Sequence, residues 1–344
     1  MVVHYKCPGC GDDMIFNSET GTLTCPACRR QEDIETFSED LITTTFEDHE
    51  AKEYNCENCG AVLITDHDTV ATRCSFCGAG VVLADRVSGT YAPSLVIPFT
   101  VSKEEAIQGF KKWCRNGLLT PNDFMTADRI KNITGMYVPF WMYDLNSRVQ
   151  VSAEGKVIRT YTRGDYIYTE TKYYDVFRDI NLDYIKVPVD ASKKMNDELM
   201  DKLEPYPYDQ LKEFKTPYLA GYIAEKYNYS DDELLPRVKS KIQSFIDSYI
   251  SSTMHGYTTV TYRMKDIDTK KVKSYYVLLP VWMVTYNYKN KDYIFAMNGQ
   301  TGKIVGNPPL SYWKMLGWFS GISAGTFVIM NILEAIVTGG WSLW

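Results

Sequence analysis

Eight of the nine cysteines in this 344-residue chain stand in four CxxC pairs before residue 78. The pairs form two sets, and every cysteine of the first set recurs 49 positions later. Within each set 14 residues separate the two pairs, a length that suits the short hairpin of a zinc ribbon. Two CxxC turns can hold one ion in a tetrahedral shell of four sulfurs, which structural zinc prefers. We therefore predict two zinc ribbons with these metal ligands: Cys7, Cys10, Cys25 and Cys28, then Cys56, Cys59, Cys74 and Cys77.

In the first ribbon, residues 14–16 and 22–24 are the expected strands. Gly11 and Gly60 follow the first pair of each set and allow the positive φ that a metal knuckle often needs. A closed shell of four thiolates leaves no open coordination position, so the two expected zinc ions are structural. Modules this small do not bury enough apolar surface to fold without the metal.

The chain begins with no apolar run ahead of Cys7, so no secretory signal peptide is expected and the thiols should stay reduced in the cytoplasm. A redox CxxC usually occurs once, in a βαβ context, whereas four occur here in a regular array. An iron–sulfur cluster would accept the same four thiolates and is the alternative to zinc.

Charge is distributed unevenly along the chain. Residues 1–86 hold 6 Lys and Arg against 16 Asp and Glu, a net charge of −10. The linker 31–53 alone has nine acidic residues and one lysine, and it is expected either to be a solvated spacer or to dock a basic partner. Affinity for nucleic acid comes largely from Lys and Arg, so the charge of this region disfavours nucleic acid as a partner.

After residue 86 the sequence alternates helical and strand patterns, which predicts an α+β fold. Helices are expected at 103–115, where Ser102 and Glu105 form a capping box, and at 231–251. Asn298 and Gly299 predict a hairpin turn. The expected domains are ribbon 1 (1–30), the acidic linker (31–53), ribbon 2 (54–86), the α+β body (87–309) and a C-terminal anchor (310–344).

The motif YVPFWM at 137–142 resembles LLPVWM at 278–283, and each motif lies downstream of an expected helix. One interpretation is an internal duplication that makes two similar half-domains. The other is a pair of edge strands that share a proline and a tryptophan. We favour the duplication.

No set of residues predicts catalysis. The segment around Lys303 has Met297 where a phosphate-binding loop needs glycine, and Ile304 where it needs the hydroxyl that holds magnesium. The four histidines have no metal-ligand spacing. A GxSxG string at 321–325 lies inside an apolar run rather than between a strand and an amphipathic helix. We therefore expect no catalytic or cofactor-binding residues and predict that the chain is not an enzyme.

Residues 315–333 carry no charge and are flanked by tryptophans, which predicts a single membrane-spanning helix in contact with the lipid bilayer. Gly317, Gly321 and Gly325 form a ridge along which a second copy or another membrane helix could pack. Lys303 and Lys314 precede the span and no basic residue follows it, so the N-terminal part is expected in the cytoplasm and the protein in the cell membrane.

The ordered combination of both cysteine sets, 137–144 (YVPFWMYD), 218–227 (YLAGYIAEKY), 295–306 (FAMNGQTGKIVG) and the apolar tail resembles a family of bacterial TFIIB-type zinc-ribbon membrane proteins. Members are often labelled primosomal-helicase-like or phage-replication-like, but this chain has no Walker A motif to support helicase activity. The resemblance implies a membrane-associated zinc protein, and some relatives are linked to envelope-stress scaffolds. We predict an adaptor that recruits cytosolic or membrane proteins; the alternative is a zinc-ribbon nucleic-acid-binding protein of replication or transcription.

Overall fold

The computed structural model of the chain describes residues 2–3, 5–34, 52–55, 62–65, 69–73, 80–83, 92–115, 117–124, 133–289 and 291–338. The first part contains eight short strands: β1 (Val2–Val3), β2 (Ile15–Asn17), β3 (Thr22–Thr24), β4 (Gln31–Glu32), β5 (Lys52–Asn55), β6 (Val62–Thr65), β7 (Thr69–Arg73) and β8 (Gly80–Leu83). The second part runs through β9 (Leu95–Val96), α1 (Lys103–Arg115), β10 (Ile133–Arg163), β11 (Tyr166–Asp190), α2 (Asp197–Leu203), η5 (Tyr208–Gln210), β12 (Lys212–Glu213), η6 (Thr216–Leu219), β13 (Ile223–Glu225), α3 (Leu235–Ser252), β14 (Thr259–Tyr288), β15 (Lys291–Asn298), β16 (Ile304–Gly306) and α4 (Tyr312–Thr338).

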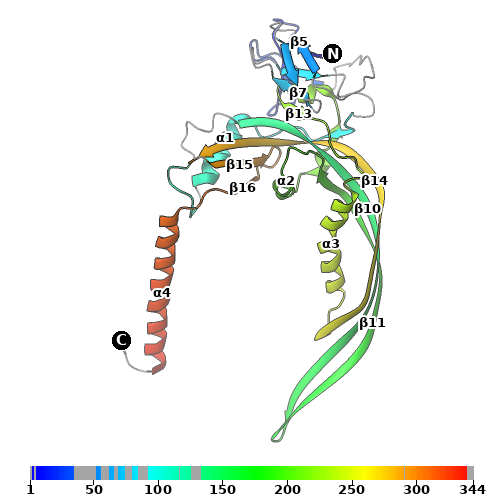
Figure 1. Cartoon of the computed structure of the whole chain (residues 1–344), viewed down its shortest axis with the longest axis vertical. Coiled ribbons are helices and arrows are strands. Elements are labelled where there is room, and N and C mark those ends of the chain that lie inside the picture. The colour runs from blue at the N-terminus through cyan, green and yellow to red at the C-terminus, as the bar shows by residue number, and fades with distance from the viewer. Residues whose placement is uncertain are drawn as a thin grey trace.

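The described residues form an α+β structure around one large mixed sheet, as the sequence predicts (Figure 1). Its strands follow the order β1-β8-β7-β13-β10-β14-β15-β16, with β11 beside β10 and the β9–β12 pair beside β14. Strands β1, β7 and β8 from the cysteine-rich part thus belong to the sheet of the body. Strands β2, β3 and β4 form a separate small sheet that carries the first cysteine set.

The body buries apolar side chains on both faces of this sheet. On one face, α1 packs Ala106 and Phe110 into a core that also includes Tyr137. On the other face, Met200 and Leu203 of α2 lie in a second core. The alternation of side chains along β10 assigns its even positions from 136 to 142 to this second core.

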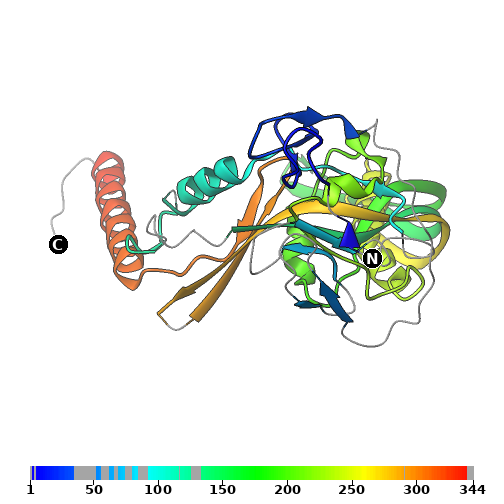
Figure 2. The same ribbon diagram turned by 90° about the horizontal axis from the view of Figure 1, so that it is seen from above.

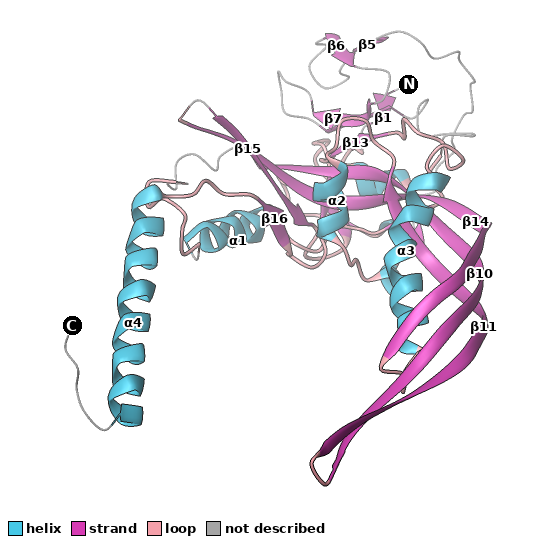
Figure 3. Ribbon diagram, turned by 60° about the horizontal axis from the view of Figure 1, so that its bottom comes forward, coloured by secondary structure: helices cyan, strands magenta, loops and turns pink. Residues whose placement is uncertain are grey.

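Beyond the body, β10, β11 and β14 continue together as a long curved extension (Figure 3). We call this extension the arm; it consists of residues 145–163, 166–184 and 259–271. Helix α3 covers one face of the arm with Val238, Ile242, Ile246 and Ile250. The two strands β10 and β11 extend past α3 and end in a hairpin turn at Gly164 and Asp165.

The motifs at 137–142 and 278–283 overlap in the antiparallel pairing of β10 with β14. Positions 141 apart in the chain also hold equivalent neighbours. Strand β10 pairs in parallel with β13 at 136–137, and β14 pairs in parallel with β9 at 277–278. The duplication stays a prediction, and this shared pattern of neighbours is what it would produce.

Several predicted elements are confirmed. Strands β2 and β3 pair as a hairpin at 15–17 and 22–24, one residue from the predicted 14–16 and at the predicted 22–24. The helix at 103–115 and the hairpin at Asn298 form as expected. The helix predicted at 231–251 begins at Leu235 instead, because Ser230 and Glu233 cap each other through a turn before it and Pro236 suits a first helical turn.

Helix α4 projects from the body on the same side as the arm (Figures 1 and 3). Seen from above, α4, which follows β16 in the chain, stands apart from the sheet (Figure 2). Of this helix, Tyr312–Ala335 is long and apolar enough to cross a membrane, and none of its apolar window is buried. Two hydrogen bonds tie its start to the body, from the Ser311 amide to the Leu119 carbonyl (2.7 Å) and from Lys314 Nζ to the Thr120 carbonyl (2.7 Å).

Candidate metal centre

The first cysteine set lies on two tight turns at one end of the β2–β3–β4 sheet. In each turn, the amide four residues after the first cysteine donates to that cysteine's carbonyl: Gly11 to Cys7 at 2.8 Å and Arg29 to Cys25 at 2.9 Å. Both donors have a positive φ, of 78° for Gly11 and 62° for Arg29. Gly11 therefore has the role that the sequence predicts, while the second turn places an arginine in the same left-handed conformation.

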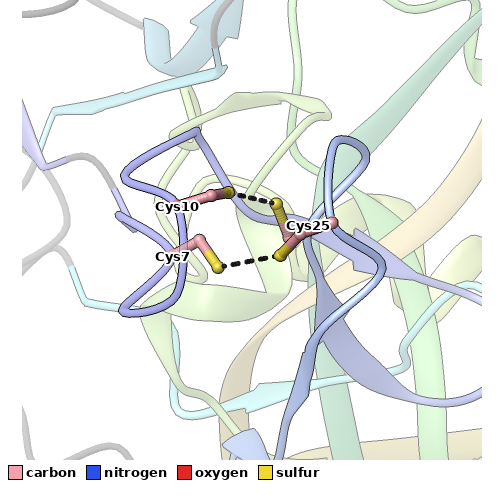
Figure 4. Close-up of side chains that lie close together, drawn as sticks. Cys7, Cys10 and Cys25 are labelled. Carbon is pink, nitrogen blue, oxygen red and sulfur yellow. Dashed lines mark hydrogen bonds between the residues drawn. The ribbon is translucent and has the colours of Figure 1, made fainter.

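These turns bring four thiols together (Figure 4). The Sγ atoms of Cys7 and Cys28 are 3.4 Å apart, as are those of Cys10 and Cys25, and all four lie within 4.8 Å of one another. Zinc–sulfur bonds of about 2.3 Å in a tetrahedron separate the sulfurs by about 3.8 Å, which falls inside this range. The first cysteine set is thus close enough to bind one metal ion.

The close packing of the thiols separates their pKa values. Burial raises the pKa of the Cys7 thiol. Hydrogen bonds from the amides of Gly9 and Cys10 and from the Cys28 thiol lower it by more, so that the pKa falls to about 7. The Asp12 amide lowers the pKa of Cys10, but the neighbouring thiols of Cys25 and Cys28 raise it, to about 12. Four thiolates so close together repel one another, and a divalent cation at their centre would compensate that charge.

Arg30 supplies positive charge beside the thiols. Its pKa is raised mainly by the hydrogen bond to Glu32 and also by the nearby Cys7 and Cys28. Its Nε donates to Glu32 Oε1 at 2.7 Å, which holds the guanidinium against the first knuckle near Gly9. Arg30 was not among the predicted site residues; a basic residue directly after the second CxxC pair was the available signal.

The ribbon is packed against the body. The Phe16 ring lies edge-on to Tyr218, with 5.4 Å between the centroids, and its amide donates to the Ala220 carbonyl at 3.0 Å. Arg73 of β7 donates to the Gly221 carbonyl from Nε (2.9 Å) and Nη2 (2.6 Å). Residues 218–227 therefore contact both the ribbon and strand β7 of the cysteine-rich part. Sequence reasoning missed both contacts.

A cavity of about 510 Å³ lies where the ribbon meets the body. Phe16, Tyr222 and Trp282 contribute apolar surface, and Glu19 and Lys103 contribute charge. The cavity is lined by both the ribbon and the start of α1, so the position of the ribbon determines its shape.

The second cysteine set and the glycine ridge are the other predicted sites. Cys56, Cys59, Cys74 and Cys77 of the second set lie outside the described residues. The glycine ridge at Gly317, Gly321 and Gly325 lies on α4, and a Cβ at any of the three would meet no atom within 4 Å. Among the described residues outside α4, Leu118 lies beside the ridge and lines a pocket with Gly317 and Gly321.

Comparison with known proteins gives one extensive match. The chain is 62% identical over 341 residues to YdjG of Bacillus subtilis (strain 168), and the alignment covers 99% of this chain and 100% of that protein. No family model matches the chain. No solved structure matches it either.

Proposed function

The chain belongs to the YdjG family, and from its structure we propose that it is a membrane-anchored adaptor that is not an enzyme. A structural zinc ion would hold the first ribbon in shape, and α4 would anchor the protein in the cell membrane. The observation that carries the proposal is the four-thiol cluster of Cys7, Cys10, Cys25 and Cys28. Four protein ligands fill a tetrahedral zinc shell, so an ion there would stabilise a contact surface rather than activate a substrate.

The second cysteine set would hold a second zinc ion, in keeping with its identical spacing. The resemblance to TFIIB-type zinc-ribbon membrane proteins supports the same assignment, and it also suggests a role in envelope stress. Both ions can be counted by elemental analysis of the purified chain. We expect about two zinc ions per chain, and iron in their place would contradict the assignment.

We further propose a single-pass orientation with the ribbons in the cytoplasm. Lys303 and Lys314 lie on the N-terminal side of the apolar segment, and the residues that follow it include no Lys or Arg. A protease added to the outside of intact spheroplasts should leave the ribbons uncut. Cleavage within the ribbons would reverse the proposed orientation.

Recruitment through the ribbon can be tested without deleting it. Deletion of the cysteine-rich part would remove β1, β7 and β8 from the main sheet, so a point probe is needed. We suggest a photo-crosslinking residue at Ala27, which is exposed on the second knuckle, and a matched control at exposed Glu198 of α2. Protein adducts formed from position 27 and absent from position 198 would support the adaptor.

The same experiment distinguishes the alternative function. Identical adducts at the two positions would contradict recruitment by the ribbon. Binding of the full chain to DNA or RNA with steep salt dependence would instead favour the nucleic-acid-binding alternative, because displaced counterions make such binding salt-sensitive. We expect no such binding, given the net charge of −10 in residues 1–86.

A further inference from the structure

One edge of the arm is open along a length that is unusual for a native sheet. Among the described residues, β11 pairs with β10 alone, and from Tyr166 to Tyr184 this pairing continues for 19 residues without a bulge. An edge strand presents unpaired N–H and C=O groups to any strand that approaches, so proteins usually shorten, bend, charge or cover such edges.

Other outer strands of the sheet are protected in these ways. In the arm, β14 has two bulges, at Arg263 and Val272, and Lys265, Lys270 and Lys271 follow its edge. In the body, β16 covers the edge of β15. The contrast leaves the β11 edge as the place where the arm can accept another strand.

The two flanks of α3 also differ: one is ion-paired to β14, and the other carries exposed aromatic rings beside β11. On the flank toward β14, Asp247 forms an ion pair with Lys265. On the other flank, Lys241 donates to the Pro188 carbonyl of β11 at 2.8 Å, which identifies the side of the helix that faces this strand. Helical periodicity places Phe245 and Tyr249 on that side too, and they are 62% and 47% exposed. A strand added to β11 would cover these rings.

The side chains of β11 define what such a strand must carry. Those facing α3 include Ile180, Leu182 and Tyr184, which are only half-buried and would contact apolar side chains. Arg178 lies in the same row and donates to the carbonyls of Thr253 and Phe177, both at 2.9 Å. The opposite face of the strand carries aspartates at every fourth position: Asp175, Asp179 and Asp183. Asp175 already forms an exposed ion pair with Arg263, and Asp179 forms one with Arg148. Basic side chains on the added strand would complement them.

We propose that the edge of β11 binds an extended segment of a partner protein in which apolar residues alternate with basic residues. The apolar residues pack on Phe245 and Tyr249, the basic residues face the aspartates, and main-chain hydrogen bonds extend the sheet by one strand. A second copy of this edge is disfavoured as the partner because it would bring two rows of aspartates together. This site is separate from the ribbon, so it does not depend on recruitment through the ribbon.

The test uses the full chain in detergent and two capped nine-residue peptides, one alternating Val with Lys and one alternating Val with Glu. Fluorescence anisotropy should show that the Val/Lys peptide binds at least about tenfold more tightly than the Val/Glu peptide. Amide hydrogen exchange should slow within 166–184 of β11. Equal affinity for the two peptides, or slower exchange along 259–271 of β14 instead, would overturn the proposal.

Variants separate the two contacts. The double substitution F245S/Y249S removes exposed rings and should weaken the Val/Lys peptide about tenfold, whereas Q243A on the opposite flank should leave its affinity unchanged. D183K should reduce the preference for the Val/Lys peptide. Asp183 accepts a hydrogen bond from the uncharged Asn146 amide, so the fold should persist in this variant. Peptide affinities that do not change in these variants would contradict the proposed contacts. A dimer of the full chain that F245S/Y249S dissociates would show that a second copy, rather than a partner protein, occupies this edge.

Discussion

Asp190 lies at the end of β11, where the arm meets the body. It is 1% exposed, and its Oδ1 accepts the Ser192 amide at 3.1 Å while its Oδ2 has no hydrogen-bond partner. Burial raises the pKa of this carboxyl to about 7, against the opposing effects of the Ser192 amide and Arg237. Asn298, at the end of β15, makes the same type of turn, and its Oδ1 accepts the Gln300 amide at 2.9 Å. The Asn298 side chain carries no charge.

The raised pKa makes folding depend on pH. The folded state binds a proton that the unfolded chain releases above pH 4, so stability falls as pH rises from about 4 to about 7. Asp190→Asn mimics the neutral carboxyl, and above pH 7 we expect it to raise the free energy of unfolding by about 2–3 kcal/mol. Urea unfolding at pH 5 and pH 8 measures this. The gain in stability of Asp190→Asn should be small at pH 5. D165N, at the exposed hairpin turn, is the control. A loss of stability of Asp190→Asn at pH 8 would contradict the assignment.

Arg29 and Gly11 occupy equivalent left-handed positions with different residues. A side chain in this conformation costs about 1 kcal/mol, partly offset by the greater freedom of glycine in the unfolded chain. Arg29→Gly should therefore stabilise the metal-loaded ribbon by about 0.5 kcal/mol, and Gly11→Ala should destabilise it by about 1 kcal/mol. Competition with a chromophoric chelator reports both through zinc affinity. Changes of the same sign in the two variants would rule out backbone strain as the cause.

At the scale of elements, α1 begins with a reciprocal cap. Ser102 donates from its amide (2.8 Å) and its hydroxyl (2.9 Å) to Glu105 Oε2, and its hydroxyl accepts the Glu105 amide at 3.3 Å. These bonds lower the pKa of Glu105, so its contribution is present above its ordinary pKa and is lost as pH falls below that range. The cap fixes the start of a helix whose Phe110 is fully buried in the body core.

Removal of the cap tests its contribution. Ser102→Ala should lower the free energy of unfolding by about 1 kcal/mol near pH 7 because the first-turn amide loses its acceptor. Ser102→Thr keeps the hydroxyl and serves as the matched control. Thermal unfolding followed by circular dichroism measures both variants. Equal melting temperatures for the alanine and threonine variants would show that the cap contributes nothing.

Local signals predicted the elements that they specify directly. The CxxC spacing predicted the thiol cluster, Ser102 and Glu105 predicted the start of α1, and Asn298 predicted a turn. The pairing of β14 with β10 in the arm was not predicted, because it joins residues that are more than 100 positions apart, such as Gly155 with Val260. The contact of Phe16 with Tyr218 was missed for the same reason. The hairpin of β10 with β11 is local, and its turn at Gly164 and Asp165 was missed.

At the scale of the molecule, the first ribbon and the body share one core. Phe16 and Leu23 of the ribbon belong to the same buried cluster as Phe110 of α1 and Tyr137 of β10. If the proposed metal holds the ribbon, its loss would remove the order that positions these side chains. The stability of the body should therefore depend on the cysteines.

Cys7→Ser tests this coupling. The variant should hold one zinc ion fewer than the parent, and we expect the unfolding of the whole chain to shift down by about 5–10 °C, equivalent to about 2–4 kcal/mol. Calorimetry with zinc analysis measures both quantities. Cys114→Ala, a buried thiol outside the cluster, should keep the full zinc content. A separate low-temperature transition, with the main transition unchanged, would show that the ribbon unfolds independently.

The common direction of α4 and the arm has a consequence for the protein at a bilayer. If α4 crossed the lipid at its present angle, the arm would enter the hydrocarbon with it, including charged side chains of the arm and the open edge of β11. Neither unpaired main-chain groups nor these charges are tolerated there. Insertion therefore requires α4 to swing away from the arm, which breaks the bonds that Ser311 and Lys314 make to the body. The segment before α4 would then act as a hinge, and the length of the arm would limit how closely the body can approach the lipid surface.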